Sequence, residues 1–264
     1  MWAGIAWAAI ALLGLAALLL WRGRRQHAQL ERLLLAADDK LEQLQRLFGR
    51  FVPAEVVEHL TASGDPGQRI DPLAPERRRV TMLFADLRGF TAMCDKLDPA
   101  VTVGILNDYF HHMTLAIGRH HGHVTEFVGD GLLALFGALE PNPWQARDAV
   151  LAALEMRAEL ARYNASLRAR GLPELRFGVG IHGGDVVAGV MGTPGLAKFS
   201  VTGDPINVAS RVEGLTSKFQ VDLLITEEIR RTLDDRFRLR PMPAALVKGK
   251  AEPIHTFYVE PDAA

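Results

Sequence analysis

The stretch VTMLFADLRGFT, from Val80 to Thr91, decides the fold. Its first six residues are almost wholly apolar, which is typical of a strand buried within a sheet. Asp86 follows directly, so a carboxylate stands at the end of the strand, and Gly89 marks a turn. The pattern predicts a buried strand that delivers an acidic side chain to one edge of a sheet.

Strand and helix patterns alternate after this stretch. In chain order they predict a strand at 80–85, a helix at 101–117, strands at 124–128 and 132–136, a helix at 144–168 and a strand at 177–181. This order predicts an α+β domain of the ferredoxin-like βαββαβ class, with helices packed on one face of the sheet. We place the domain at residues 77–260.

A second carboxylate, Asp130, occupies the tip of the hairpin predicted by Gly129–Asp130–Gly131. In this topology Asp86 and Asp130 can converge on one edge of the sheet. Paired carboxylates with few other ligands suit Mg²⁺, and backbone N–H groups near Gly89 can hold a phosphate chain. An aspartate at a hairpin tip is commonplace, however, so position alone leaves a metal site and an ordinary turn equally open.

Four segments resemble motifs of the class III nucleotidyl cyclases, in that family's order and spacing. Residues 84–91 (FADLRGFT) resemble the first metal motif, and residues 127–131 (FVGDG) resemble the second. Residues 202–211 (TGDPINVASR) are similar to the transition-state segment, and residues 247–250 (VKGK) to the late phosphate-contacting lysine motif. The resemblance therefore spans most of the predicted domain.

The resemblance implies a role for each matching residue. Asp86 and Asp130 would hold two Mg²⁺ or Mn²⁺ ions, with the Leu87 carbonyl as a further ligand. Asn207 would orient a ribose, and Arg211 would stabilise charge on a pentavalent phosphorus. The implied phosphate contacts are Gly89, Phe90, Thr91 and Lys250, with Lys248 as the less favoured lysine. No side chain stands out as a general base.

The implied reaction is attack of the ribose 3′-OH of ATP or GTP on its own α-phosphorus, which yields cAMP or cGMP and expels pyrophosphate. The resemblance also implies a homodimer with shared sites. One subunit would contribute Asp86 and Asp130, and the other Asn207, Arg211 and the base-recognition pair. The alternative is an inactive cyclase fold that serves as a dimerisation or nucleotide-binding module, but all the candidate metal and transition-state residues are present.

The base-recognition positions implied by the family are Glu126 and Ser200. Adenylate cyclases usually carry Lys and then Asp or Thr there, whereas guanylate cyclases carry Glu and then Cys. Glu126 can accept hydrogen bonds from guanine N1–H and N2–H₂, whereas the N1 acceptor of adenine would face a carboxylate unfavourably. Ser200 does little to distinguish the two bases, because its hydroxyl group can donate or accept a hydrogen bond. The chemistry leans slightly towards GTP and leaves ATP open.

The N-terminal residues 1–22 are predicted to form a transmembrane helix. No charged side chain lies between Trp2 and Trp21, and twenty residues of helix span about 30 Å, the thickness of the hydrocarbon core. Arg22, Arg24 and Arg25 follow, which places the catalytic domain on the cytoplasmic side of an inner or plasma membrane. A cleaved signal peptide, the main alternative, would carry its basic residues before the apolar run.

Residues 26–61 are predicted to form a coiled coil that leads into the domain. Its apolar positions alternate in spacings of four and three: Leu30, Leu34, Ala37, Leu41, Leu44, Phe48 and Phe51. An amphipathic helix packed on its own domain would show the same pattern, but a parallel dimeric coil is favoured. Gly and Pro residues make 62–76 a linker.

Composition excludes several other classes of protein. The formal net charge of −1 argues against a nucleic-acid partner. A single cysteine, Cys94, excludes a disulfide framework and any multi-cysteine metal site. Hydrophobic residues make up 48% of the chain, which excludes a disordered chain.

Overall fold

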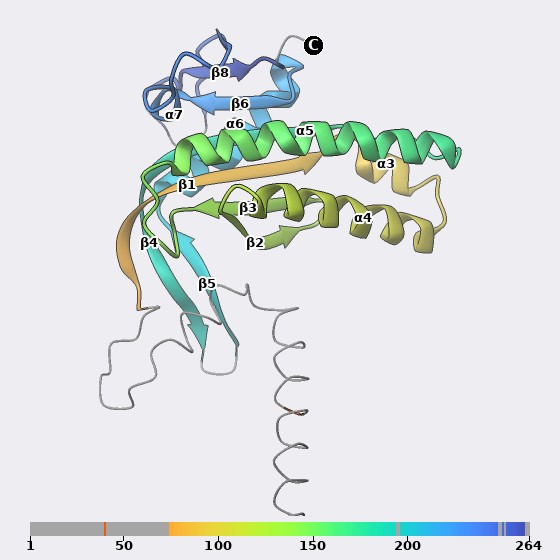
Figure 1. The fold of residues 1–264 in the computed structure, drawn as a ribbon, viewed down its shortest axis with the longest axis horizontal. Coiled ribbons are helices and arrows are strands. Elements are labelled where there is room, and N and C mark those ends of the chain that lie inside the picture. The colour runs from red at the N-terminus through yellow and green to blue at the C-terminus, as the bar shows by residue number, and fades with distance from the viewer. Residues whose placement is uncertain (1–39, 41–73, 194–195, 248–249, 251, 262–264) are drawn as a thin grey trace, which may run out of the picture. The chain divides into compact units, whose positions relative to one another are not determined.

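The computed structural model describes residues 40, 74–193, 196–247, 250 and 252–261 (Figure 1). The predicted transmembrane helix (1–22), the coiled coil (26–61, apart from residue 40) and nearly all of the linker (62–76) lie outside these residues and stay predictions. Within the described ranges, none of the helices combines the length and apolar character that crossing a bilayer requires.

The described strands form one sheet in the order β2-β3-β1-β4-β6-β8-β7, with β5 paired to β4 (Figure 1). The elements in chain order are β1 (Glu76–Leu87), α3 (Phe90–Cys94), α4 (Pro99–Gly118), β2 (Gly122–Val128), β3 (Gly131–Phe136), α5 (Gln145–Ala169), β4 (Phe177–Thr193), β5 (Leu196–Thr202), α6 (Asp204–Phe219), β6 (Leu223–Thr226), α7 (Glu227–Arg230), β7 (Leu239–Pro241) and β8 (Thr256–Val259). The mixed α+β fold and the βαββαβ order are confirmed.

Strand β1 lies between β3 and β4 and is antiparallel to both. Its register places Ala85 opposite Leu132 of β3, and Asp86 opposite Gly178 of β4. Strand β4 runs on to Thr193, well beyond the predicted end at residue 181, and pairs with β5. The prediction stopped short because residues 183–192 include four glycines, which interrupt the apolar run by which a buried strand is recognised.

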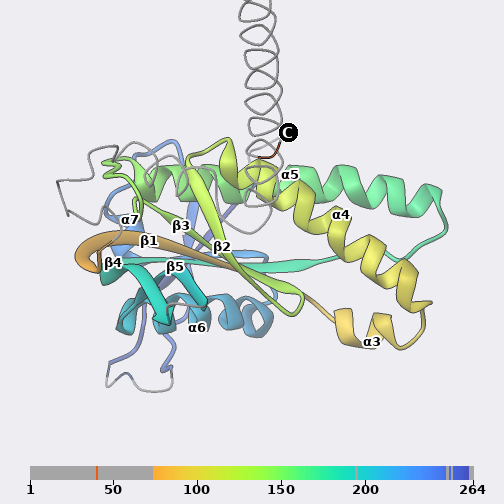
Figure 2. The same cartoon turned by 90° about the horizontal axis from the view of Figure 1, so that it is seen from below.

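The two helices of the βαββαβ unit pack on one face of the sheet, as predicted, and a later helix, whose face was not predicted, covers the other. Helices α4 and α5 cover one face, where Leu83 and Ala85 of β1 lie in the same core cluster as residues of both helices. Helix α6 covers the other face, and its Ala209 shares a second core cluster with Val80 and Met82. Figure 2 shows α5 and α6 on opposite sides of β1 and β4.

Helix α6 lies directly on the backbone of β4. A Cβ atom at Gly180 would stand 2.1 Å from the backbone nitrogen of Glu213, far inside van der Waals contact. A Cβ atom at Gly178 would stand 2.8 Å from Glu213 Oε1. These two glycines therefore set the distance between α6 and the sheet.

We predict that Gly180→Ala lowers the free energy of unfolding by about 1–3 kcal/mol or more, because the helix backbone cannot give way as a side chain can. The matched control is Gly104→Ala in α4, where a Cβ atom meets nothing within 4 Å. That control should be stabilised by about 0.5–1 kcal/mol, as expected for glycine replaced in an open helical position. Denaturant unfolding measures both, and equal effects would contradict the close contact.

Candidate functional site

The two predicted metal-binding carboxylates come together at the end of β1. Gly131 follows Asp130 in the hairpin, and a Cβ atom at Gly131 would stand 2.9 Å from Asp86 Oδ1 and 3.0 Å from the Ala85 carbonyl oxygen. Gly129 makes the turn in a left-handed conformation with φ of +63°. The hairpin tip that carries Asp130 thus lies against the Asp86 side chain.

Burial raises the pKa of the Asp86 carboxyl, and the neighbouring Asp130 charge raises that pKa further, against a smaller opposing effect of a hydrogen bond from the Leu87 backbone. A divalent cation relieves this repulsion, and carboxylates are the hard oxygen ligands that Mg²⁺ prefers. No group of three or more His, Cys, Asp or Glu within the described ranges is placed to hold a metal. The Asp86–Asp130 pair fits an ion that keeps water and phosphate oxygens in its shell.

Sequence reasoning missed a third carboxylate, Glu213 of α6, beside this pair. Its Oε1 lies over Gly178, which is the register partner of Asp86. Burial raises the pKa of Glu213 to about 7, helped by the charges of Asp86 and Asp130 and opposed by Arg88. The only signal in the sequence was the pair of glycines at 178 and 180, which leave room for a helix on the strand.

A second group of site residues gathers at the start of α6. Asn207 is exposed, and Arg211 lies four residues later, one helical turn away on the same side of the helix. Lys250 Nζ lies 2.5 Å from Asp204 Oδ2. The charge and hydrogen bond of Lys250 lower the pKa of Asp204, and Arg211 lowers it further. Lys248 lies outside the described residues.

The residues of the turn that is predicted to contact phosphate differ in how far their side chains are buried. Gly89 adopts φ of +69° and is the N-cap of the short helix α3. Phe90 is buried in the core beneath α4 and α5, so only its backbone is available to a ligand, whereas Thr91 is exposed. The side chain of Leu87 is also buried, which leaves its backbone as the group that could serve a metal.

The predicted base-recognition residues lie on β2 and β5. Glu126 of β2 forms an ion pair with Lys198 of β5, with 2.6 Å between Lys198 Nζ and Glu126 Oε1. Ser200 lies two residues along β5, on the same face of the strand as Lys198. Lys198 is a further residue that the sequence did not reveal, because the contact joins strands 72 residues apart.

Because the native state holds a proton on Glu213 more tightly than the unfolded chain does, stability falls as the pH rises from about 4.5 to about 7. We predict that Glu213→Gln removes this slope and stabilises the metal-free protein at pH 8 by about 1–2 kcal/mol, allowing for partial exposure. Thermal unfolding with EDTA at pH 5 and pH 8 measures this. Glu140→Gln, at an exposed position, is the control; identical slopes in wild type and Glu213→Gln would contradict the prediction.

Comparison with curated proteins links this geometry to known enzymes. The chain is 35% identical over 229 residues to an adenylate cyclase of Anabaena cylindrica, across 84% of this chain and 44% of the relative. It is 31% identical over 212 residues to adenylate cyclase 1 of Rhizobium meliloti, across 80% of this chain and 31% of the relative. The chain thus spans less than half the length of either relative.

Solved structures show the same fold. The guanylyl cyclase Cya2 superposes with a TM-score of 0.67 at 33% identity, covering 71% of this chain and 94% of that one. The adenylyl cyclase CyaB from P. aeruginosa superposes with a TM-score of 0.68 at 26% identity, covering 72% and 98%. The family model for the adenylate and guanylate cyclase catalytic domain matches residues 73–261. The chain therefore belongs to the class III adenylate and guanylate cyclases.

Proposed function

We propose that this chain converts a purine nucleoside triphosphate, ATP or GTP, to the 3′,5′-cyclic nucleotide and pyrophosphate with two Mg²⁺ or Mn²⁺ ions. The observation that carries the proposal is the placement of Asp86 and Asp130 side by side at the end of β1. Bound divalent ions there would lower the pKa of the ribose 3′-OH and neutralise the pyrophosphate. The complete set of site residues disfavours the inactive-module alternative.

The other site residues position the substrate. Asn207 would orient the ribose, and Arg211 would offer a fixed guanidinium to the charge that develops on the α-phosphorus. Lys250, or less favourably Lys248, would contact the terminal phosphates, for which Lys250 must leave Asp204. The backbone of the turn at Gly89, Phe90 and Thr91 would donate N–H groups to the phosphate chain.

A cyclase assay tests the proposal directly. The purified chain is incubated with Mn²⁺ and either ATP or GTP, with Asp86→Asn as the control. We expect a cyclic mononucleotide from wild type and at least about a hundredfold less from the control, because one carboxylate of the metal pair is lost. No product from either nucleotide would support the inactive module, and linear or dinucleotide products would place the chain in another class of enzyme.

We further propose a homodimer whose two active sites are each shared between subunits. The charge that acts on Asp86 is that of Asp130 in the β2–β3 hairpin, whereas Arg211 acts on Asp204 at the start of α6. The exposed Asn207 supports this division, since its side chain remains available to a partner.

We predict that Asp86→Ala and Arg211→Ala are each inactive alone and recover activity when co-expressed. Half of the dimers formed from equal amounts would be mixed, and each mixed dimer would hold one intact site, which gives about a quarter of wild-type activity. Product formation by co-purified, differently tagged copies measures this. No recovery in confirmed mixed dimers would contradict a shared site.

The ion pair between Glu126 and Lys198 provides both an acceptor and a donor for a purine base. Towards guanine, Glu126 would accept from N1–H and N2–H₂ while Lys198 donates to O6. Towards adenine, the pair would accept from N6–H₂ and donate to N1. Guanine uses more of the available groups, which agrees with the sequence-based lean towards GTP. Adenylate cyclase relatives make ATP the second candidate.

We predict that Glu126→Gln lowers the ratio of kcat/KM for GTP to that for ATP by at least about tenfold, because an amide can donate to adenine N1 and presents its NH₂ group to guanine N2–H₂. The control is Ser200→Ala, which should change the ratio by less than about threefold, since one neutral hydroxyl group discriminates weakly. Steady-state kinetics with both nucleotides measures the ratio. An unchanged ratio in Glu126→Gln would exclude Glu126 from base recognition.

We also propose that residues 1–22 anchor the chain in the inner or plasma membrane and that residues 26–61 form a dimeric coil that holds two catalytic domains together on the cytoplasmic side. The support is the uncharged run from Trp2 to Trp21 and the heptad spacing after it. Extraction of membranes at alkaline pH tests the anchor, and release of the chain into the supernatant would contradict it.

A further inference from the structure

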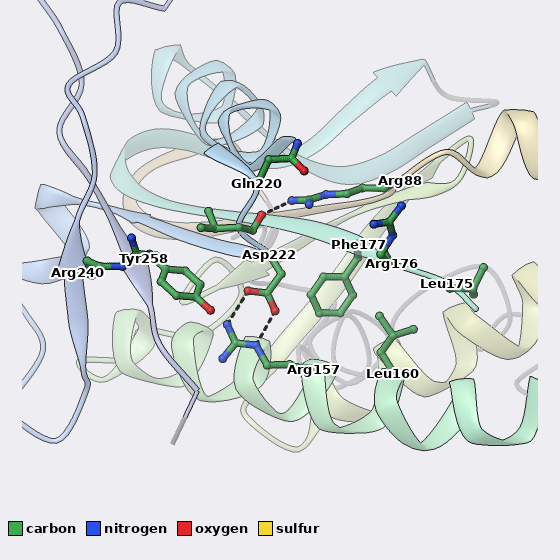
Figure 3. A pocket seen from close by; sticks show the side chains of 11 residues that line it. Arg88, Arg157, Leu160, Leu175, Arg176, Phe177, Gln220, Asp222, Arg240 and Tyr258 are labelled. Carbon is green, nitrogen blue, oxygen red and sulfur yellow. Dashed lines mark hydrogen bonds and ion pairs between the residues drawn. The ribbon is translucent and has the colours of Figure 1, made fainter. Parts of the chain in front are cut away.

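A pocket of about 480 Å³ opens at the end of the sheet where β1 stops and β4 and β6 begin. Four arginines line it, from four different segments: Arg88, Arg157, Arg176 and Arg240. Figure 3 shows Arg157 and Asp222 joined near the centre, with Arg88 and Arg176 on one side and Arg240 beside Tyr258 on the other.

Positive charge in this pocket exceeds negative charge. The carboxylate that lines it, Asp222, is held by Arg157 through two hydrogen bonds of 2.7 and 2.9 Å. Arg240 lies over the ring of Tyr258, 5.0 Å from its centre, and reaches outwards to Glu260 at 3.6 Å. The remaining cationic groups face the pocket without a matching carboxylate among its lining residues.

Arg88 is the least satisfied of these groups. Its side chain donates to the Val221 carbonyl oxygen, and no ion pair joins it to a carboxylate within the described residues. Arg88 Nε is buried and has no hydrogen-bond partner, and the same is true of Arg157 Nη1. Burial accordingly lowers the pKa of Arg88. Buried donors without partners are rare in folded proteins and are a reason to look for a missing ligand.

Apart from Gln220, the rest of the lining is mainly apolar or aromatic. Phe177, Leu160 and Leu175 supply carbon surface beside Arg157 and Arg176, and the ring of Tyr258 adds an aromatic face. Guanidinium forks match phosphate oxygens in a bidentate manner, and apolar walls suit a ring or other organic body. The volume is within the range of small-molecule sites.

The metal carboxylates are not among the residues that line the pocket. Leu160 of α5 and Phe177 belong to the core cluster on the α4–α5 side of the sheet. The side chains of Asp86 and Glu213 lie instead on the α6 side, where Gly178 makes room for them. Arg88 joins the two regions, because it lines the pocket and its charge also acts on Glu213.

We propose that this arginine-lined pocket is a second ligand site, which binds a small organic phosphate, a phosphate group on a ring-bearing body. The phosphate would take hydrogen bonds from Arg88 and Arg176, and the organic part would lie against Phe177 and Tyr258, with Arg240 adding positive charge from the opposite side of the pocket. The site is independent of the proposed cyclase reaction, because its recognition groups are not the metal or transition-state residues.

Calorimetric titration of the full chain in EDTA, with adenosine 5′-monophosphate and inorganic pyrophosphate as probes, tests this site without relying on catalysis. The test variant is Arg176→Ala with Arg240→Ala, two exposed positions whose loss should not disturb folding. The control is Arg236→Ala with Arg238→Ala, which removes the same charge from exposed arginines outside the pocket. A third variant, Arg211→Ala, reports on the proposed catalytic site.

We expect the monophosphate to bind wild type, the control and Arg211→Ala alike, and to bind the test variant at least about tenfold more weakly, because one charge-assisted contact and the positive charge on the opposite side of the pocket are lost. Pyrophosphate should bind more weakly than the monophosphate because it lacks the organic part. Three results would overturn the proposal: no binding of either probe, equal affinity in test and control variants, or loss of binding in Arg211→Ala. Equal affinities for pyrophosphate and for the monophosphate would contradict the claim that the pocket recognises the organic part of the ligand.

Discussion

The register of β1 between its two neighbours is the constraint on which the rest of this structure depends. It places Asp86 opposite a glycine on β4 and against a glycine of the hairpin on the other side. Because neither neighbour has a side chain at these points, the carboxylate has room, and Asp130 and Glu213 can both approach it. A shift of one residue would turn Asp86 to the α4–α5 face and separate the three carboxylates.

Charge is then distributed unevenly around this end of the sheet. On the α6 side, burial raises the pKa values of Asp86 and Glu213, and neighbouring carboxylates raise them further. In the arginine-lined pocket, guanidinium groups exceed the carboxylates that line it. Arg88 stands between the two regions and moderates the charge of Glu213. Each region on its own carries unbalanced charge, and each is therefore suited to a ligand of the opposite sign.

The sequence predicted the first half of the domain well and the second half poorly. The strand at 80–85, the hairpin around Asp130 and the helices before and after it were recognisable because each has a regular apolar period. The long β4, its pairing with β5 and the position of α6 on the opposite face were not, since glycines conceal the strand and the choice of face depends on tertiary contacts.

The residues of the functional site were likewise only partly predictable from the sequence. Asp86 and Asp130 stand out because each ends or turns an apolar strand, and family motifs drew attention to Asn207 and Arg211. Glu213 and Lys198 had no such signal: the first depends on a helix lying on glycines, and the second on a contact between distant strands. The four arginines of the pocket come from four separate segments, so no local pattern in the sequence could predict the pocket.

The contact of α6 with the glycines of β4 also limits how this sequence can change over time. Where two elements meet through side chains, a larger residue on one can be accommodated by a smaller residue on the other. At Gly180 the opposing group is the helix backbone, which every amino acid shares, so no substitution on α6 can make room. Gly180 therefore cannot be replaced by a larger residue unless the whole helix α6 moves away from the sheet.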